Sequence, residues 1–339
     1  MIYIFSKIGD FSTNLIIDWL EFFEEKYIRI NDEPADSIKY QNLFDQLSKC
    51  SINSNKRDKE NDVFWFRRPD HKLIQKLSDK ELKMEDILYP KFSEDKIYFN
   101  SLNTNYKNYL KTFFHLILDD ESTRIGSYNK TGLNKIKVLQ QAEKLGIQVP
   151  PYIVTNDLDE LKTFFNENNN DLICKSLFEI VYPLGVNEAG FLLRCLTSQI
   201  SDITTLPRSF YPSLFQKNIH KEFEIRTFFL EGKCYSGAMF TQNNEKTVTD
   251  FRNYDSEKPT RMIPYQLDEE LEEKLKQLMT ASGLNTGSID IMKGTDGNYY
   301  FLEINPVGQF GFVSEPCNYN FPKIIAQALI KKKNGAVQN

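Results

Sequence analysis

The sequence predicts a protein of mixed α/β and α+β class with two or three domains. Its 339 residues exceed the length that one hydrophobic core usually organises. In the first third of the chain, short apolar runs alternate with amphipathic stretches, which is typical of an open α/β domain. The last third is richer in apolar strands joined by tight turns. These three observations together indicate several layers of helix and sheet.

The amino-terminal third contains three strand patterns and two helix patterns. Apolar runs predict strands at residues 2–5, 27–30 and 63–66, and amphipathic stretches predict helices at 14–25 and 102–118. A polar stretch at 51–62 indicates an exposed loop. The order of the strands in their sheet does not follow from the pattern.

The middle of the chain alternates in the same way. Its pattern predicts a helix, a strand, a helix and a strand at residues 134–145, 152–155, 157–167 and 172–175. Gly146 is placed to end the first of these helices, and Asp157 is placed to cap the second. The last strand is apolar except for the lysine that ends it, Lys175.

The carboxyl-terminal part is expected to begin with a hairpin. Its two strands, at 224–230 and 233–240, are joined by a turn at Glu231 and Gly232. The pattern then predicts a helix at 268–281, strands near Ser288 and Tyr299, and a final helix at 322–332.

Composition argues against several classes of protein. The 42 Lys and Arg residues against 47 Asp and Glu residues give a net charge of -5, whereas a dedicated nucleic-acid binder is normally basic. No apolar stretch approaches the length of a membrane span, and the apolar start is too short for a signal peptide. We therefore expect a cytoplasmic protein that contacts neither nucleic acid nor membrane.

Cysteine and histidine offer little for metal or nucleophile chemistry. The five cysteines are odd in number, far apart and without CxxC spacing, so neither a disulfide framework nor a zinc site is expected. The three histidines are isolated from one another in the sequence. Chemistry is therefore expected from carboxylates and cationic side chains.

The most informative segment is 287–306, in which two apolar strands flank a Gly-Thr-Asp-Gly turn and predict an antiparallel hairpin. Pairing Lys293 with Tyr300 would set Asp290 opposite Glu303, and Asn305 would share the face of Glu303. The alternating apolar residues would face a core: Ile289, Ile291, Leu302 and Ile304. Oxygen donors without His or Cys suit Mg²⁺. Alternation of this kind on an antiparallel strand is more often a solvated face, so the spacing alone leaves both readings open.

Further residues make the metal reading stronger. Lys135 lies in a predicted helix, and Lys175 ends a predicted strand. Five further motifs follow along the chain: Phe215-Gln-Lys-Asn-Ile219, Glu224-Ile-Arg226, Asp250-Phe-Arg252, Asp290 and Glu303-x-Asn305. In order and spacing, this set resembles the ATP-grasp ligases over about residues 130–330. Within that superfamily it looks most like the peptide maturases that make graspetides, the microviridin-type macrocyclases. The strings at 250–254, 284–290 and 301–309 resemble the grasp-with-spasm branch.

The resemblance implies an ATP-grasp fold with a diverged α/β amino-terminal domain. The domains would be an amino-terminal domain at 1–125, a central ATP-grasp subdomain at 126–213 and a carboxyl-terminal subdomain with the metal site at 214–339. ATP would lie between the last two.

The resemblance also implies a role for each motif. Lys135 and Lys175 would reach the phosphates of ATP, and Asp290, Glu303 and Asn305 would hold Mg²⁺. The adenine would meet backbone groups of Gln216, Lys217, Asn218 and Ile219, and Glu224 would accept from the ribose. Arg252 would bind the γ-phosphate in the transition state, with Arg226 and Arg261 as weaker catalytic candidates. Without the motifs, each arginine would be read as an exposed ion-pair partner.

By resemblance, the substrate is a ribosomally made precursor peptide with a leader and a core, and the enzyme is a homodimer. An Asp or Glu side chain of the core would become an acyl phosphate and then be joined to a Thr or Ser hydroxyl or a Lys amine. Two features depart from the family. The phosphate-covering loop at 176–190 holds only Gly185 and Gly190, and Ser288 stands where some carboxylate–amine ligases have an arginine.

Two alternatives stay open. A ligase of the glutamate-adding type would use the same ATP site with a free amino acid as acceptor. A non-catalytic ATP-binding interaction protein would keep the fold without turnover, although the complete set of carboxylates and lysines argues against this. A nucleotide-dependent dehydrogenase is excluded because no GxGxxG follows an early strand.

Overall fold

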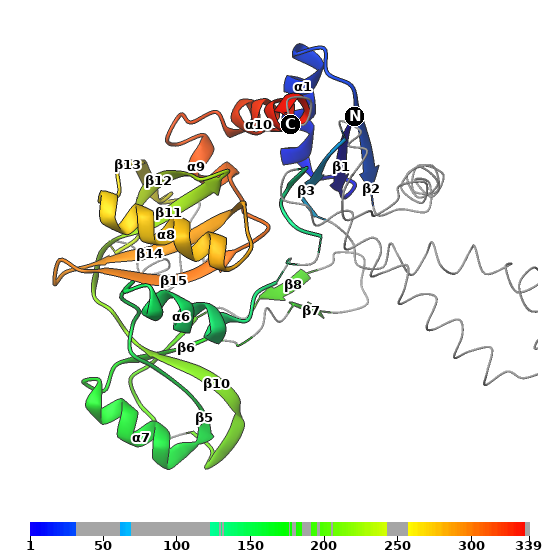
Figure 1. Cartoon of the computed structure of the whole chain (residues 1–339). Helices are drawn as coiled ribbons and strands as arrows, with labels where there is room; N and C mark the ends of the chain where they lie inside the picture. The colour runs from blue at the N-terminus through cyan, green and yellow to red at the C-terminus, as the bar shows by residue number, and fades with distance from the viewer. Residues whose placement is uncertain are drawn as a thin grey trace, which may run out of the picture. The chain divides into compact units, whose positions relative to one another are not determined.

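A computed structural model of the chain describes residues 1–31, 62–68, 123–128, 130, 132–175, 177, 181–184, 191–194, 197–204, 206–242 and 257–335. The chain forms two compact units (Figure 1). Unit 1 comprises Met1–Thr131, Leu284–Thr286 and Asn320–Asn339, and unit 2 comprises Gly132–Gly283 and Gly287–Tyr319.

Unit 1 is built on a parallel sheet of four strands. These are β1 (Ile2–Ser6), β2 (Tyr27–Asn31), β3 (Val63–Phe66) and β4 (Arg124–Ile125), in the order β2-β1-β3-β4. Every residue of β1, β3 and β4 is buried, which explains why these segments are short and almost continuously apolar. The three predicted amino-terminal strands are confirmed.

Two helices pack against each other in unit 1. They are α1 (Phe11–Phe22) and α10 (Phe321–Gly335). The predicted helix at 14–25 is confirmed with a shift toward the amino terminus, because Glu24 takes a positive φ of 56° and the helix ends before it. The predicted final helix is also confirmed. An ion pair between Lys333 and Glu25 links the ends of the two helices.

The predicted helix at 102–118 and the predicted loop at 51–62, apart from Asp62, lie outside the described residues.

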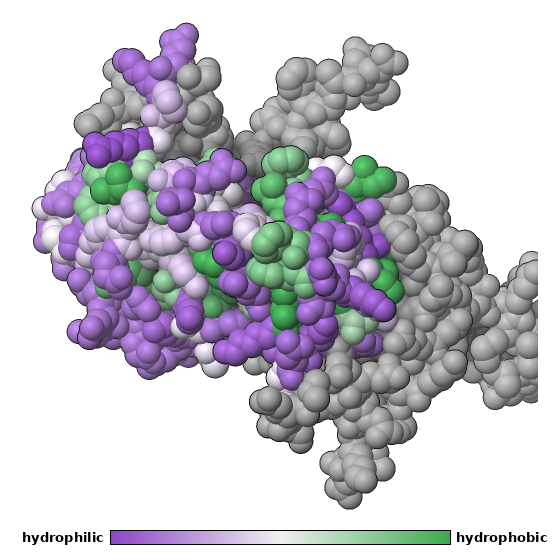
Figure 2. All heavy atoms as spheres, turned by 90° about the horizontal axis from the view of Figure 1, so that it is seen from above, coloured by the Kyte–Doolittle hydropathy of each residue, from purple (hydrophilic) through white to green (hydrophobic). Residues whose placement is uncertain are grey.

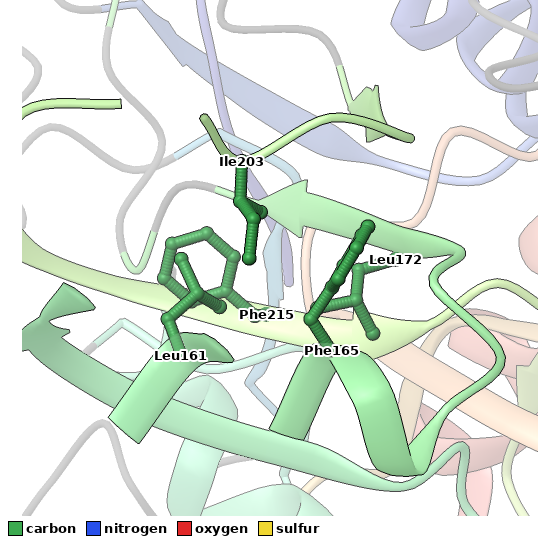
Figure 3. Close-up of a cluster of buried hydrophobic side chains, with 5 residues drawn as sticks. All are labelled: Leu161, Phe165, Leu172, Ile203 and Phe215. Atoms are coloured by element: carbon green, nitrogen blue, oxygen red, sulfur yellow. The ribbon is translucent and has the colours of Figure 1, made fainter. Parts of the chain in front are cut away.

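The first sheet of unit 2 is antiparallel. Its strands are β5 (Tyr152–Asp157), β10 (Ser209–Lys217), β6 (Leu172–Lys175) and β9 (Ser198–Ile200), in the order β5-β10-β6-β9. Helix α7 (Leu158–Glu167) covers one face, and Asp157 caps it as predicted by accepting from the N–H groups of Asp159 and Glu160. The core beneath the helix is apolar (Figure 3) and consists of Leu161, Phe165, Leu172, Ile203 and Phe215.

Helix α6 (Lys135–Lys144) confirms the predicted helix at 134–145. Asn134 caps its start by accepting from the N–H of Lys137 at 3.0 Å. Gly146 follows its end with a φ of +68°, the left-handed conformation that glycine adopts without strain. The helix packs against strand β15 (Tyr299–Asn305), which places Lys135 beside the second sheet of this unit.

The second sheet of unit 2 has five strands. They are β13 (Arg261–Tyr265), β12 (Lys233–Phe240), β11 (Lys221–Leu230), β14 (Thr286–Gly294) and β15, in that order across the sheet. The predicted hairpin is confirmed as β11 and β12, and both turn residues, Glu231 and Gly232, take positive φ. Helix α8 (Glu269–Ala281) confirms the predicted helix and buries Leu275, Leu278 and Met279.

The remaining elements are short. Strands β7 (Val181–Leu184) and β8 (Phe191–Arg194) form an antiparallel pair, and α9 (Gly311–Ser314) is a single turn. The coloured residues on the face shown in Figure 2 are mainly hydrophilic, with hydrophobic residues in separate groups. No helix within the described ranges is both long and apolar enough to cross a membrane.

Candidate functional site

The hairpin of β14 and β15 brings the two predicted carboxylates together. Asp290 pairs directly with Glu303, as predicted, but the register between this pair and the hairpin turn differs from the predicted one. The predicted partner of Lys293, Tyr300, is wrong: Lys293 pairs with Tyr299. A register shift after Asp290 leaves Leu302 as an extra residue in β15, a β-bulge that restores the pairing of the carboxylates.

The bulge also changes which residues enter the core. Ile289, Ile291 and Ile304 are buried as predicted, whereas Leu302 is only half-buried. A bulged residue leaves the strict alternation of the strand, so its side chain does not share the core face.

Asn305 lies two residues beyond Glu303 and pairs with Ser288. Its side-chain oxygen accepts from the N–H groups of Val307 and Gly308, at 3.1 and 3.3 Å. Gly308 has a φ of +57°, and a Cβ at this position would lie 3.2 Å from backbone atoms of Gly287. The amide of Asn305 therefore holds a tight glycine turn against β14.

Arg226 enters the site from β11. Its Nη1 donates to both carboxylate oxygens of Asp290, at 2.9 and 3.0 Å. The two side chains are 6% and 10% exposed, so this is a buried ion pair. Since Asp290 and Arg226 come from neighbouring strands, the pair fixes one carboxylate on the face that also carries Glu303.

Lys135, the first residue of α6, places its ammonium 3.3 Å from Oε2 of Glu303. Both side chains remain about a quarter to a third exposed. Each of the two carboxylates therefore has a cationic side chain beside it, and the four groups together carry no net charge.

Glu224 lies two residues before Arg226 and is also buried. Thr241 donates to its Oε1 at 2.9 Å, and Lys221 forms an ion pair with the same atom. Sequence reasoning named Glu224 but missed Lys221 and Thr241. The spacing of Lys221 in the strand does not single it out, and Thr241 lies beyond the hairpin turn.

Lys175 ends β6, where it pairs with Leu214 of β10. Gln216 of β10 pairs with Ile173 of β6. Directly paired residues of an antiparallel sheet share a face, so Lys175 and Gln216 lie on the face opposite Phe215 and the α7 core.

The side chain of Gln216 is unusual. The residue is 1% exposed, and neither its amide nitrogen nor its amide oxygen has a hydrogen-bond partner within the described residues. Leaving a buried polar group unpaired costs about 1–3 kcal/mol. The amide is therefore suited to a ligand that presents both a donor and an acceptor.

The residues after Gln216 are tied to the rest of the sheet. The N–H of Lys217 donates to Pro151 at 2.8 Å, and the N–H of Asn218 donates to Asp171 at 3.1 Å. Ile219 is half-buried in the short connection before β11. These two N–H groups are used inside the chain, so adenine recognition by this segment would depend on its other groups.

The structure does not bring every predicted site residue together. Arg261 begins β13 opposite Phe240, and the register places it on the opposite face of the sheet from Arg226. Arg252, with the rest of Asp250-Phe-Arg252, lies outside the described residues, as does most of the loop at 176–190.

The donors fit one class of metal ion. No three His, Cys, Asp or Glu residues cluster anywhere in the described ranges, so the set consists of two carboxylates and one amide. Mg²⁺ commonly takes one or two protein carboxylates and completes its shell with water and phosphate oxygens. The residues therefore fit Mg²⁺ carried with a nucleotide better than a bare ion, because the carboxylates already face two cations.

No protein-family model matches the chain, and no curated protein matches it. Solved structures do. One is an ATP-grasp ligase of Chryseobacterium gregarium that is associated with ribosomal peptide modification, in complex with ADP and a leader and core peptide. It is 21% identical in sequence with a TM-score of 0.66, and the match covers 98% of this chain and 96% of that chain.

Two further structures match at similar length. The macrocyclase MdnC of Microcystis aeruginosa, bound with precursor peptide MdnA, is 21% identical with a TM-score of 0.63, covering 98% of this chain and 99% of that chain. The ATP-grasp ligase PsnB, complexed with a precursor variant, Mg and ADP, is 15% identical with a TM-score of 0.63, covering 98% of each chain. The chain therefore has the ATP-grasp fold, and the predicted fold is confirmed.

The buried ion pair predicts a clear pattern of stability. Arg226→Met leaves Asp290 buried without its guanidinium, so the free energy of unfolding should fall by about 3–5 kcal/mol. The double variant Arg226→Met/Asp290→Leu removes both charges and should recover most of that loss. Urea denaturation measures both variants, and equal losses in the single and double variants would contradict the pairing.

Proposed function

We propose that the chain is an ADP-forming ATP-grasp ligase that cyclises a ribosomally made precursor peptide. It would activate Asp or Glu side chains of the core as acyl phosphates and join them to Thr or Ser hydroxyls or Lys amines, forming macrocyclic esters or amides. The observation that carries the proposal is the shared site face of Asp290 and Glu303, each beside a cationic side chain, in a chain of ATP-grasp fold.

We assign the nucleotide site to residues of unit 2. Asp290, Glu303 and Asn305 would hold Mg²⁺, which when bound neutralises charge on the transferring phosphoryl group. Lys135 and Lys175 would bind phosphate oxygens. Their ammonium groups on flexible stems suit that role.

The base and the ribose would be held by two neighbouring segments. The amide of Gln216, which has no hydrogen-bond partner among the described residues, matches the N6 donor and N7 acceptor of adenine, a pairing that Gln makes elsewhere. Backbone groups at 216–219 would add to it. Glu224, oriented by Thr241 and Lys221, would accept from ribose hydroxyls.

The arginines divide into different roles. Arg226 contacts Asp290, so we assign it to positioning the metal carboxylate rather than to the reacting atoms. Arg252 remains our candidate for stabilising the transferring phosphoryl group. Arg261 has the weakest support as a catalytic residue, because the strand register places it on the opposite face of the sheet from Arg226.

The reaction requires activation because a carboxylate has a poor leaving group. Phosphoryl transfer from ATP to a carboxylate oxygen gives an acyl phosphate and ADP. Attack by a hydroxyl or amine on the acyl carbon then releases inorganic phosphate and forms the ester or amide. Holding both peptide groups on one enzyme makes the second step effectively intramolecular.

Partners follow the family that the sequence resembles. The Chryseobacterium, MdnC and PsnB structures contain precursor peptides, so a peptide with leader and core is our proposed partner. We also propose that the chain works as a homodimer in the cytoplasm.

The decisive experiment is the intact mass of the short peptide encoded beside the gene after incubation with enzyme, ATP and Mg²⁺. One water should be lost per bond, with matching ADP. Replacing a residue that only hydrogen-bonds to a metal ligand typically costs about 10- to 100-fold in activity. Asp290 is itself the proposed ligand, so Asp290→Asn should lower the rate by more than that. Asp296→Asn, on the turn of the same hairpin, is the matched control.

The outcomes separate the alternatives. A gain in mass equal to added glutamate would identify a glutamate-adding ligase instead. An unchanged mass with no ADP would support a non-catalytic nucleotide-binding protein. Full activity of Asp290→Asn would remove the metal assignment.

The ion pair between Lys135 and Glu303 predicts how tightly the nucleotide-free protein binds a metal ion. Lys135→Met removes the ammonium that lies 3.3 Å from Glu303, so Mn²⁺ without nucleotide should bind about two- to fivefold more tightly, the effect expected from loss of a partly exposed ion pair. Electron paramagnetic resonance of free Mn²⁺ measures this. Lys137→Met, an exposed lysine of the same helix, should leave the affinity unchanged; the same gain in both variants would contradict the pairing.

Gln216 gives a test with two readouts. Gln216→Leu removes a buried amide that makes no hydrogen bond within the described ranges, so the nucleotide-free protein should be at least as stable as the wild type in thermal unfolding. Affinity for ATP should fall about tenfold or more, because the pairing with adenine is lost. Gln199→Leu, an exposed position of the same sheet, is the control. Unchanged ATP affinity would show that the amide does not read the base.

A further inference from the structure

The parallel sheet of unit 1 has a feature that ATP binding in unit 2 does not use. Strand β1 lies between β2 and β3, and the chain leaves β1 through α1 toward β2 but later returns to the other side for β3. The strand order therefore reverses between β1 and β3. In open α/β sheets, ligands bind outside the carboxyl ends of strands at such a reversal.

Two arginines lie at this reversal. Arg67 and Arg68 follow β3 directly, and the backbone N–H of each donates to the carbonyl oxygen of Phe5 at 3.1 Å. Phe5 is near the carboxyl end of β1. The chain after β3 therefore folds over the end of β1, which fixes the backbone of both arginines there.

The arginines share one carboxylate, that of Asp10 at the start of α1. Its Oδ2 lies 3.7 Å from Nε of Arg67 and 3.2 Å from Nε of Arg68. Asp10 makes no capping hydrogen bond to the helix, and Arg67 also donates to Ser12 at 3.2 Å. The carboxylate therefore faces both arginines through Oδ2, and its Oδ1 accepts a hydrogen bond from the hydroxyl of Ser12.

The two arginines differ in exposure. The side chains of Arg67 and Asp10 are 4% and 3% exposed, whereas that of Arg68 is 38% exposed. Burial lowers the pKa of Arg67 to about 10, with Asp10 opposing and Arg68 adding to the shift. Arg67 remains protonated at neutral pH, so the inner pair serves as support for the outer arginine.

Further positive charge lies at the same edge of the sheet. The guanidinium of Arg29 donates to the carbonyl of Lys7, in the loop after β1, at 2.9 Å. Lys7 itself is exposed. The field at this edge therefore favours an anion.

We propose that unit 1 carries a carboxylate-binding site centred on Arg68, which takes an acidic side chain of a peptide. Arg67 and Asp10 position the guanidinium, whose planar fork matches a carboxylate in a bidentate manner. The peptide as occupant rests on the proposed function, in which acidic side chains are the groups that react. The anion site itself rests on the geometry of unit 1.

The test uses the full chain and two labelled peptides. One contains several glutamates, and the other has glutamines in their place. Fluorescence anisotropy should show the glutamate peptide binding about tenfold or more tightly to the wild type. Arg68→Gln should abolish that preference, and Arg68→Lys should reduce it, because the charge remains while the fork is lost.

A matched control separates the site from overall charge. Lys26→Gln removes a positive charge at the amino edge of the same sheet, and the preference should persist. An unchanged preference in Arg68→Gln, or an equal loss in Lys26→Gln, would overturn the site. Displacement of the peptide by equimolar free glutamate would overturn the peptide as occupant.

The same preparations keep this inference separate from the proposed function. ATP-dependent loss of water from the precursor peptide reports the ligase activity. A glutamate preference that depends on Arg68 without any such loss would uphold the site and reject the ligase. Water loss with unaltered kinetics in Arg68→Gln would uphold the ligase and reject the site.

Discussion

The register between β14 and β15 decides which side chains meet at the candidate site. Side chains of a strand alternate with a period of two, so a slip of one residue would move Glu303 and Asn305 to the opposite face. The bulge at Leu302 absorbs one residue between the turn and the site. The hairpin can therefore close on its glycine turn and still set Asp290 against Glu303. Arg226 and Lys135 find their partners only because of this register.

Charge compensation is the second principle of the site. Two carboxylates on one face repel each other, and Asp290 is nearly buried. A neighbouring strand supplies a guanidinium to one, and a packed helix supplies an ammonium to the other. The nucleotide-free protein thereby keeps two carboxylates close together without the cost of an unpaired buried charge. The Arg226–Asp290 pair is buried and the Lys135–Glu303 pair is partly exposed, so the two cations are suited to different tasks.

Much of this architecture follows from local patterns. Apolar periodicity predicted the strands of β1, β3 and β6, and side-chain chemistry predicted the cap at Asp157 and the stop at Gly146. The facing of Asp290 and Glu303 was also predictable, because the hairpin is local. The bulge was not, since Leu302 is an ordinary apolar residue in the pattern. The bond from Arg226 to Asp290 joins residues 64 positions apart, and no local rule fixes such a contact. The burial of the Gln216 amide likewise depends on its neighbours in β5 and β6.

The division of the chain bears on the order in which the protein is made. Unit 1 includes both the amino-terminal strands and α10, and all of unit 2 lies between them in the sequence. A chain emerging from the ribosome would expose α1 without its partner helix until α10 has been translated. Unit 2 is complete before that moment, and domains generally fold as units during synthesis. The four strands of the amino-terminal sheet all precede unit 2 in the sequence, but α1 would still depend on the last helix to cover it. Loss of α10 would therefore harm a part of the protein that is synthesised early.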